Sequence, residues 1–391
     1  MARGSAGDRR RVPRGRGGAD RRTLARAAAS AGAVAAGIAL CAAAGGTPAP
    51  ARVQPPADPR PQGRAFTLLA TGDVIPYPSI IDQARADGGG AAYDFGPIFA
   101  GVRDMVAGAD LALCHVETPF GEPDGPFTGY PVFSSPPQLA AALSDVGYDS
   151  CSTASNHALD GGTEGVHRTL EALDEAGVAH AGSGRTRGES GRPALLRAGG
   201  ATVAQLSYAS FTNIEGPAQA VNLLDARRVI ADARAARRAG ADIVVVSVHW
   251  GTEWQQEPDG AQLRLADRLT GSRTAGRKDI DLVVGTHNHV AQPYEKVNGT
   301  WVVYGLGDQV ASFVPGLYRG NEGSAARFTF APRAGGWTVV KAEFLAQHSD
   351  TGPPFRLLPA TPGSAPEVYG RVAEAVLSRG AGADGLREGA G

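Results

Sequence analysis

Short apolar runs that end in polar side chains are the feature that most restricts how this sequence can fold. Each run has the length and near-continuous hydrophobicity of a strand that is buried on both faces. The runs are "FTLLATGD" (66–73), "ADLALCHVET" (109–118), "YDSCSTASNH" (148–157), "ADIVVVSVHWG" (241–251) and "DLVVGTHNHVAQP" (281–293). Amphipathic stretches with helical spacing lie between them and end in glycine, at 138–147, 165–177 and 225–240. This alternation predicts an α/β fold with parallel neighbouring strands.

The ends of these runs carry side chains that can bind a divalent cation. The candidate ligands are Asp73, Glu117, Asn156, His249, His287 and His289. The carboxyl ends of parallel strands meet at one edge of a sheet, where ligands gather. Taken singly, each has a structural alternative: an Asp after a strand often forms a turn or a helix cap, and a lone histidine is commonly a core residue. Their joint placement at the ends of five strands predicts a metal centre.

The kinds of ligand restrict the metal. His287 and His289 lie two residues apart, and such residues on a strand point the same way and can reach one ion together. Carboxylate and amide oxygens with three imidazoles suit Mn, Fe or Zn better than Ca or Mg, and the lack of thiolates disfavours a purely structural Zn site. Six ligands fit two ions that share a bridging carboxylate. Two divalent ions can activate water and polarise a phosphate ester, so the pattern favours a hydrolase.

The charge distribution points to export. Residues 1–64 hold twelve Arg and three Asp, whereas the remainder holds 26 basic and 36 acidic residues. An Arg-rich start, an Ala/Gly-rich stretch at 27–44 and a small-residue cleavage site at Ala49-x-Ala51 predict an export signal over 1–51, of the Sec or twin-arginine type. The acidic remainder excludes a general binder of nucleic acid. Contact with a membrane is expected only through an uncleaved signal. The protein is therefore expected outside the cell or in the envelope.

Composition also divides the chain. Residues 52–64 are a Pro-rich linker, 65–348 form the main domain, and 349–391 form an extension with a helix near 366–380 and a flexible tail from Gly380. Two cysteines, Cys114 and Cys151, lie in the main domain inside apolar runs. Buried free thiols are the preferred interpretation, with a single disulfide as the alternative.

Six short motifs resemble the CapA family, the capsule and poly-gamma-glutamate synthesis proteins of bacterial envelopes. The motifs are "TGDV" (71–74), "VETP" (116–119), "ASNHALDGG" (154–162), "VHWGTEW" (248–254), "GTHNHVAQPYE" (285–295) and "VVYGLGD" (302–308). This family is similar to the calcineurin-like metallophosphoesterases. The resemblance implies a four-layer α/β/β/α sandwich with mixed sheets and two divalent metal ions at the strand ends.

The resemblance also implies roles for individual residues. Asp73 and His289 would bind one metal, and Glu117 would bridge the two. The ligands of the other metal would be Asn156, His249 and His287. His157 would protonate the leaving oxygen or stabilise its charge. Asp160 would orient His157, although a carboxylate in the first turn of a helix is the alternative.

Several positions depart from the family pattern. Ile75 stands where ordinary phosphoesterases carry a histidine, so the first metal lacks a ligand. His115 could supply the missing nitrogen or could serve only as a hydrogen-bonding group. Thr286, Asn288 and Asp308 also differ from the usual residues, and an insertion at 271–281 is expected to reshape one wall of the cleft.

Two functions compete. The leading hypothesis is an exported metal-dependent hydrolase that acts on an anionic envelope polymer or on a phosphorylated intermediate of it. The alternative is an assembly or transport component of the capsule-synthesis machinery that holds the anionic polymer through its ions without turnover. A serine hydrolase is disfavoured because the sequence contains no Gly-x-Ser-x-Gly turn.

Overall fold

A computed structural model describes residues 63–314 and 316–390. The expected export signal (1–51) and nearly all of the expected linker (52–64) lie outside the described residues. Within the described ranges, no helix combines the length and hydropathy needed to cross a membrane.

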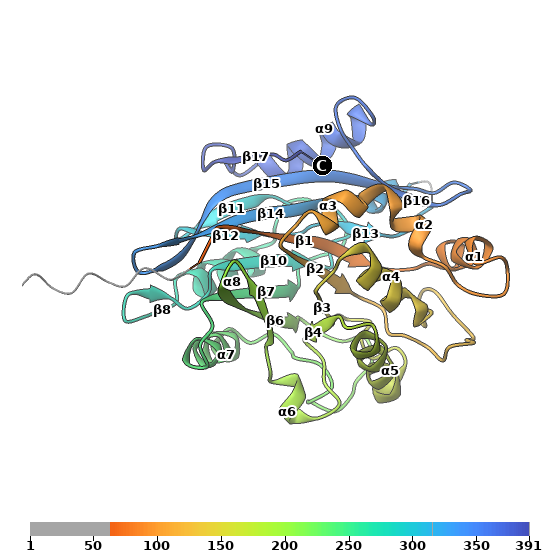
Figure 1. The fold of residues 1–391 in the computed structure, drawn as a ribbon, viewed down its shortest axis with the longest axis horizontal. Coiled ribbons are helices and arrows are strands. Elements are labelled where there is room, and N and C mark those ends of the chain that lie inside the picture. Colours follow the sequence, from red (N-terminus) through yellow and green to blue (C-terminus); the bar gives the residue numbers. More distant parts are fainter. Residues whose placement is uncertain (1–62, 315, 391) are drawn as a thin grey trace, which may run out of the picture. The chain divides into compact units, whose positions relative to one another are not determined.

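The larger sheet has nine strands and contains both parallel and antiparallel pairs (Figure 1). Strands β1, β2, β3 and β4 run parallel to one another, while β14, β15 and β16 are joined in antiparallel order at the side of β1. The bounds are β1 Phe66–Val74, β2 Leu111–Val116, β3 Ser150–Ser152, β4 Ala179–Ala181, β13 Asp308–Val310, β14 Glu322–Arg333, β15 Gly336–Asp350, β16 Arg356–Pro359 and β17 Leu386–Glu388. The short strand β13 pairs with the carboxyl end of β1.

The smaller sheet has six strands in the order β11-β12-β10-β7-β6-β5. Its centre, β12, β10, β7 and β6, is parallel, and both edge strands are antiparallel to their neighbours. The bounds are β5 Ala194–Ala198, β6 Ala201–Ala209, β7 Ile243–His249, β10 Leu282–Thr286, β11 Tyr294–Val297 and β12 Thr300–Val303. The mixed sheets are as expected.

Alternate residues along the central strands face opposite layers, because successive side chains on a strand point to opposite sides of the sheet. Leu68 of β1 and Val245 of β7 belong to the apolar core between the two sheets. Leu69 instead faces a layer of helices on the larger sheet: α1 Pro78–Asp87, α2 Gly96–Phe99, η1 Ala100–Val102, α3 Arg103–Ala107, α4 Gln138–Val146 and α5 Gly162–Glu175. Val244 faces α7 (Ala226–Arg238) and α8 (Gly260–Thr270) on the smaller sheet. The four-layer sandwich is confirmed.

The helices begin and end where the sequence provides caps. The Asp259 side chain accepts hydrogen bonds from the first turn of α8, and the Gln262 side chain accepts one from the Asp259 backbone N–H. The Asp225 side chain caps the first turn of α7. Gly147 closes α4 with a left-handed backbone, a conformation that glycine adopts without strain.

The C-terminal extension differs from its prediction. The expected helix is present as α9 (Pro366–Leu377), but the flexible tail from Gly380 is wrong for the described residues. Strand β17 pairs in parallel with β15, Leu386 is 1% exposed, and Arg327 donates a hydrogen bond to the carbonyl of Ala390. An apolar anchor and a strand pairing therefore hold this segment on the larger sheet.

The insertion at 271–281 also differs from its prediction. It forms a hairpin of two short strands, β8 Arg273–Thr274 and β9 Arg277–Lys278. Arg273 and Lys278 donate to the backbone carbonyls of Asn298 and Gly299, in the turn between β11 and β12. This position is at the amino end of β10, whereas the polar residues follow its carboxyl end. The hairpin does not form a wall of the cleft.

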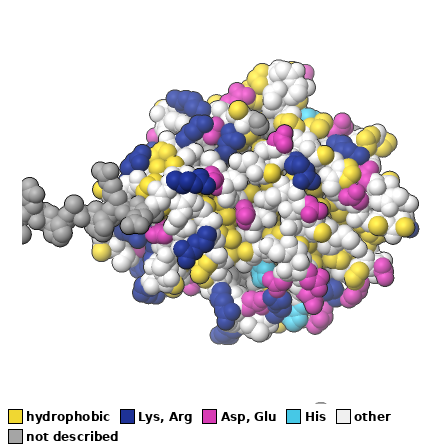
Figure 2. Space-filling model, in the orientation of Figure 1, with side chains coloured by type: hydrophobic (Ala, Val, Ile, Leu, Met, Phe, Trp, Pro, Cys, Tyr) yellow, Lys and Arg dark blue, Asp and Glu magenta, His cyan; other side chains and the backbone are white. Residues whose placement is uncertain are grey.

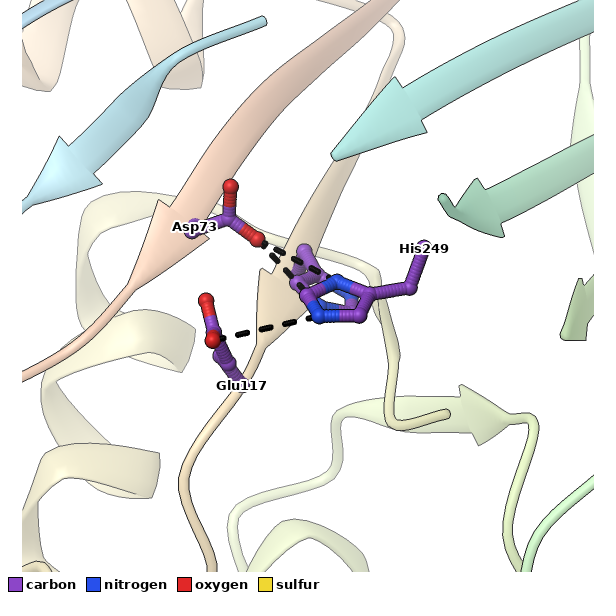
Figure 3. Close-up of side chains that lie close together, drawn as sticks. Asp73, Glu117 and His249 are labelled. Atoms are coloured by element: carbon purple, nitrogen blue, oxygen red, sulfur yellow. Dashed lines mark ion pairs between the residues drawn. The ribbon is translucent and has the colours of Figure 1, made fainter. Parts of the chain in front are cut away.

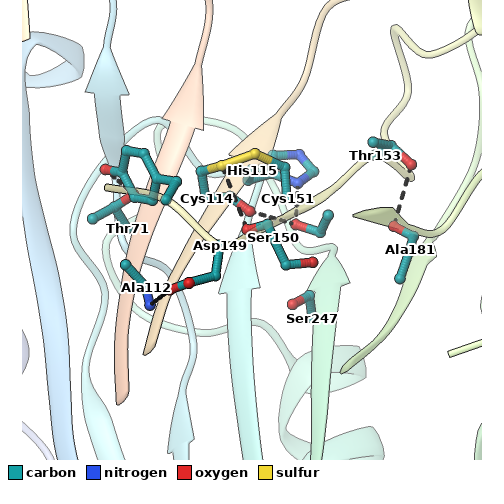
Figure 4. Close-up of a disulfide and its surroundings, with 12 residues drawn as sticks. Thr71, Ala112, Cys114, His115, Asp149, Ser150, Cys151, Thr153, Ala181 and Ser247 are labelled. Carbon is teal, nitrogen blue, oxygen red and sulfur yellow. Dashed lines mark hydrogen bonds between the residues drawn. A yellow bond between two sulfur atoms is a disulfide. The ribbon is translucent and has the colours of Figure 1, made fainter. Parts of the chain in front are cut away.

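The two cysteines form a disulfide that joins β2 to β3 (Figure 4). The preferred interpretation of buried free thiols is wrong, and the alternative is correct. Parallel pairing places Cys114 directly opposite Cys151, which brings their Cα atoms to 4.4 Å. His115 and Ser152 follow the two cysteines, and His115 Nδ1 lies 2.7 Å from Ser152 Oγ.

On the face shown in Figure 2, Lys and Arg side chains stand apart and are interspersed with Asp and Glu. No basic stripe of the kind that tracks a nucleic acid backbone crosses the described residues of this face.

Candidate metal centre

The centre lies where the carboxyl ends of strands from both sheets approach one another. Asp73, near the end of β1, is in register with His115 on β2 and with Asp308 on β13. A Cβ on Gly72 would lie 1.7 Å from the carbonyl oxygen of Gly307, so only glycine permits the backbone to pass this closely. The "TGD" and "GLGD" motifs therefore bring two carboxylates into one buried site.

One cluster of possible ligands contains Asp73, His115, Glu117 and His249. Each offers one atom, and these atoms lie within 4.8 Å of one another. Asp73 Oδ1 is 3.4 Å from His115 Nε2 and 3.6 Å from His249 Nδ1. Glu117 Oε1 is 3.8 Å from His249 Nε2. Figure 3 shows the carboxylates of Asp73 and Glu117 turned toward the His249 ring.

A second cluster contains Asp73, His289 and Asp308, again with one atom of each within 4.8 Å. His289 Nδ1 lies 3.1 Å from Asp308 Oδ1. All three residues are buried. Asp73 belongs to both clusters, whereas Glu117, the bridge that the resemblance implied, belongs to the first cluster alone.

Asn156 and His287 lie beside the first cluster. Asn156 Oδ1 is 2.8 Å from His249 Nε2, and the other nitrogen of that ring is 3.0 Å from Thr286 Oγ1. The His287 ring lies 4.6 Å from the His249 ring, measured between centroids. The structure thus brings all six sequence-predicted ligands to one place.

The geometry of the histidine pair differs from the prediction. Strand β10 ends at Thr286, so His287 and His289 are not on the strand. Both have left-handed backbones, with φ of 92° and 57°, which is uncommon for residues other than glycine. Their ring centroids are 6.2 Å apart. A strained turn, rather than alternation along a strand, directs both rings into the centre.

Burial shifts the acidity of the carboxyl groups. Burial, together with the charge of Asp308, raises the pKa of Asp73 to about 7. Burial and the charge of Asp73 raise the pKa of Glu117 well above its usual range. Burial raises the pKa of Asp308 as well. Three buried carboxyl groups so close together resist ionisation unless positive charge is supplied.

The imidazoles show the complementary shifts. Burial lowers the pKa of His115 and of His287 to about 3 each, and that of His249 well below its usual value. Burial alone would also lower the pKa of His289, but the Asp308 carboxylate raises it to about 9. Three of the rings are therefore neutral at pH 7, the form in which imidazole binds metals.

Several buried polar atoms of the centre have no hydrogen-bond partner among the described residues. They are His115 Nε2, Glu117 Oε2, His287 Nδ1 and Asp308 Oδ2. Buried polar groups are almost always paired, because an unpaired one costs about 1–3 kcal/mol. Unpaired nitrogen and oxygen atoms of ligating side chains, gathered around shared carboxylates, are what a site for divalent cations requires. These residues fit the metal centre that the sequence predicted.

His157 lies beside the centre and is held by Asp160. His157 Nδ1 is 2.6 Å from Asp160 Oδ2, and the same carboxylate oxygen accepts a hydrogen bond from the backbone N–H of Phe133. Helix α5 begins at Gly162, so Asp160 precedes the first helical turn. The arrangement favours an orienting role for Asp160 over the helix-terminal alternative.

A cleft of about 370 Å³ opens over the centre. Glu117, His157 and His289 contribute to its lining. The remaining lining residues are Ile75, Tyr77, Tyr130, Phe133, Glu253, Trp254, Ser312, Phe313, Val314 and Leu317. Sequence reasoning missed these aromatic residues, which come from loops with no shared spacing. Sequence reasoning also left the roles of His115 and Asp308 open, although both residues lie on strands in register with Asp73.

Comparisons with known proteins place these features in a family context. The profile of the family described as "Bacterial capsule synthesis protein PGA_cap" matches residues 67–312. The PGA biosynthesis protein CapA of Bacillus subtilis (strain 168) is 30% identical over 175 residues, which cover 43% of this chain and 44% of that protein. The probable polyglutamine synthesis accessory protein of Mycobacterium tuberculosis (strain ATCC 25618 / H37Rv) is 31% identical over 225 residues, covering 52% of this chain and 56% of that protein. The matches thus span about half the length of these relatives.

Two solved structures are similar at low sequence identity. The calcineurin-like phosphoesterase YfkN from Bacillus subtilis aligns with a TM-score of 0.45 and 15% identity, over 80% of this chain and 99% of that one. The 5'-nucleotidase precursor from Thermus thermophilus aligns with a TM-score of 0.45 and 18% identity, over 80% of this chain and 58% of that one.

Proposed function

This chain belongs to the PGA_cap family of bacterial capsule synthesis proteins, and from that premise we propose that it is an exported, metal-dependent hydrolase that cleaves a phosphate ester during capsule or poly-gamma-glutamate synthesis. The observation that carries the proposal is the set of unpaired, buried ligand atoms around Asp73. A site for cations at the floor of an open cleft suits hydrolysis better than a purely structural role.

Two divalent ions are proposed for the centre. Asp73, His289 and Asp308 would hold one of them. The other would be held by Asp73, Glu117, His249 and His115, with Asn156 and His287 beside it. Ions bound there would act as Lewis acids toward an ester oxygen and lower the pKa of water.

His157 is proposed as the proton donor to the leaving oxygen. Its Nδ1 faces the Asp160 carboxylate at 2.6 Å, so a protonated ring directs its Nδ1 proton to Asp160 and can donate from Nε2. The hydrogen bond from the Phe133 backbone to Asp160 fixes the carboxylate in place. The Phe133 ring packs against His157 edge to face, with centroids 4.7 Å apart, and restricts its rotation.

The proposed location, outside the cytoplasm, is supported by the disulfide. Cys114 and Cys151 are buried and bonded. Structural disulfides persist mainly in oxidising compartments, such as the cell surface and secreted proteins. The expected signal at 1–51 agrees with this location.

The proposed function is tested by hydrolysis of 4-nitrophenyl phosphate with added manganese. We expect turnover by the wild type and a loss of about 100-fold or more in kcat for His157→Ala, with bound metal retained. His167→Ala is the matched control, because His167 lies on α5 outside both clusters and the cleft lining. Metal binding without turnover in the wild type would contradict the hydrolase and favour the non-catalytic assembly role.

A further inference from the structure

Aromatic rings form a continuous wall on one side of the cleft. We name Phe133, Tyr77, Phe313 and Trp254 the aromatic arc. Neighbouring rings along the arc are in contact, and its two ends touch the expected acid and an expected ligand. The centroid distances are 4.7 Å for His157–Phe133, 5.4 Å for Phe133–Tyr77, 5.0 Å for Tyr77–Phe313, 4.9 Å for Phe313–Trp254 and 5.2 Å for Trp254–His289. The wall therefore spans the space beside the reacting groups.

The arc is assembled from four separate segments of the chain. Tyr77 follows β1, Phe133 precedes α4, Trp254 follows β7 and Phe313 follows β13. Trp254 has a φ of 65°, a conformation that is strained for a bulky residue. Its backbone N–H donates to the carbonyl of Asn288 at 2.9 Å, between the two expected histidine ligands. Backbone strain at a residue that is hydrogen-bonded to the turn of the metal centre is typical of a functional site.

The charges in the cleft restrict what the arc can bind. Glu117 and Glu253 line the cleft, and no Lys or Arg stands among its described lining residues. Metal ions at the floor would attract one anionic group. Further carboxylates on the same ligand would meet an apolar wall and the acidic side chain of Glu253, where an unpaired charge is costly. A densely charged polymer therefore finds no cationic partner along this wall.

The mouth of the cleft continues the apolar character of the wall. Tyr130 is 76% exposed, Val314 65% and Leu317 42%. All three line the cleft. Large apolar side chains that are exposed and adjacent commonly mark a place where a ligand covers them.

We propose that the cleft selects esters that carry one anionic group for the metal centre and an uncharged, ring-bearing organic part that packs on Trp254 and Phe313. The inference rests on the proposed hydrolase function and narrows its substrate to a singly phosphorylated intermediate rather than the extended polyanion. Aromatic faces contact sugar rings and planar rings alike, and a cleft of about 370 Å³ is of the size used for small molecules.

Binding of phosphonates to the manganese-loaded protein tests this selectivity without requiring turnover. Phenylphosphonate and phosphonoacetate share the anionic head, but one carries a neutral ring and the other an extra carboxylate. By isothermal titration calorimetry, we expect phenylphosphonate to bind at least about tenfold more tightly. Trp254→Ala should weaken phenylphosphonate about tenfold and change methylphosphonate by less than about twofold, while Trp254→Phe should retain most of the affinity.

Trp337→Leu is the matched control. Trp337 packs against Phe66 at the amino end of β1, whereas Asp73 lies near the carboxyl end of that strand. This variant should bind both phosphonates as the wild type does.

The outcomes separate the inference from the function on which it rests. Equal affinities for the two phosphonates, or no effect of Trp254→Ala, would overturn the inference even if 4-nitrophenyl phosphate is hydrolysed. Preference for the ring without any hydrolysis would support the selectivity and contradict the hydrolase. Absence of phosphonate binding to the metal-loaded protein would overturn the inference.

Discussion

The carboxylate of Asp73 accepts a hydrogen bond from the backbone N–H of His287, with Oδ2 3.0 Å from the nitrogen. The two residues belong to β1 and to the turn after β10, in different sheets, and are separated by 214 positions in the sequence. This bond ties the end of β1 to that turn, so one carboxylate both joins the sheets and belongs to both candidate ligand clusters.

Replacing Asp73 should therefore remove metal from both clusters. Asp73→Asn keeps an oxygen that can accept the His287 hydrogen bond but lacks the charge, so we expect most of the bound metal and the turnover to be lost while the fold remains. Asp308 belongs only to the second cluster, so the Asp308→Asn variant should lose about half of the bound metal. Elemental analysis measures the bound metal of the two variants, and circular dichroism shows whether each keeps its fold. Wild-type metal content in Asp73→Asn would contradict the shared role.

The stability of the metal-free protein should depend on pH through His289. Its folded pKa, about 9, exceeds the ordinary value of 6.5, because the charged ring pairs with Asp308. The stabilisation is complete below pH 6.5 and disappears as the pH rises through 9. We expect a loss on the order of 3 kcal/mol in the free energy of unfolding, measured by urea denaturation. His289→Gln should remove this pH dependence, and an unchanged slope in that variant would exclude His289 as its source.

His115 should contribute to metal affinity, rather than only to hydrogen bonding. Its Nε2 is buried, unpaired and 3.4 Å from Asp73 Oδ1, while its Nδ1 contacts Ser152. We expect His115→Gln to weaken binding of one ion by about 10- to 100-fold, and Ser152→Ala, which only frees the ring, to have a smaller effect. Metal titration monitored by calorimetry distinguishes the two. Equal losses of metal affinity in His115→Gln and Ser152→Ala would favour a purely hydrogen-bonding role for His115.

Loss of the disulfide should lower both the stability of the protein and its affinity for metal. The bond joins Cys114 to Cys151 across 37 positions and lies next to His115. We expect the Cys114→Ala, Cys151→Ala double variant to lose about 2–5 kcal/mol of stability and to bind metal more weakly. Chemical denaturation and metal titration measure the two effects. Wild-type metal affinity in this variant would mean that strand pairing alone positions His115.

The sequence predicted the sheet edge and its candidate ligands because both depend on a local pattern, the apolar runs that end in polar residues. Apolar runs specified β1 and β7, and parallel strands bring polar residues such as Asp73 and His249 to the carboxyl edge of their sheets. The geometry of His287 and His289 could not be predicted in this way. Their positive φ values belong to a turn that is held by distant residues, Asp73 among them, and a conformation so uncommon outside glycine is not specified by the local sequence.

Features that depend on contacts between distant segments were missed or left open. Cys114 and Cys151 become neighbours only when the register of β2 and β3 is known. The aromatic arc requires the conformations of four loops, because Trp254 and Phe313 have no periodic relation in the sequence. The sequence predicts a tail where the structure has strand β17, because Gly- and Ala-rich surroundings hide a single buried anchor, Leu386.

Anomalous X-ray scattering from crystals grown with manganese tests the central claim most directly. We expect two anomalous peaks, one among Asp73, His289 and Asp308 and the other among His115, Glu117 and His249, with Asp73 touching both. Crystals that contain manganese elsewhere, or nowhere, with these side chains paired only to one another or to water, would contradict the existence of a metal centre.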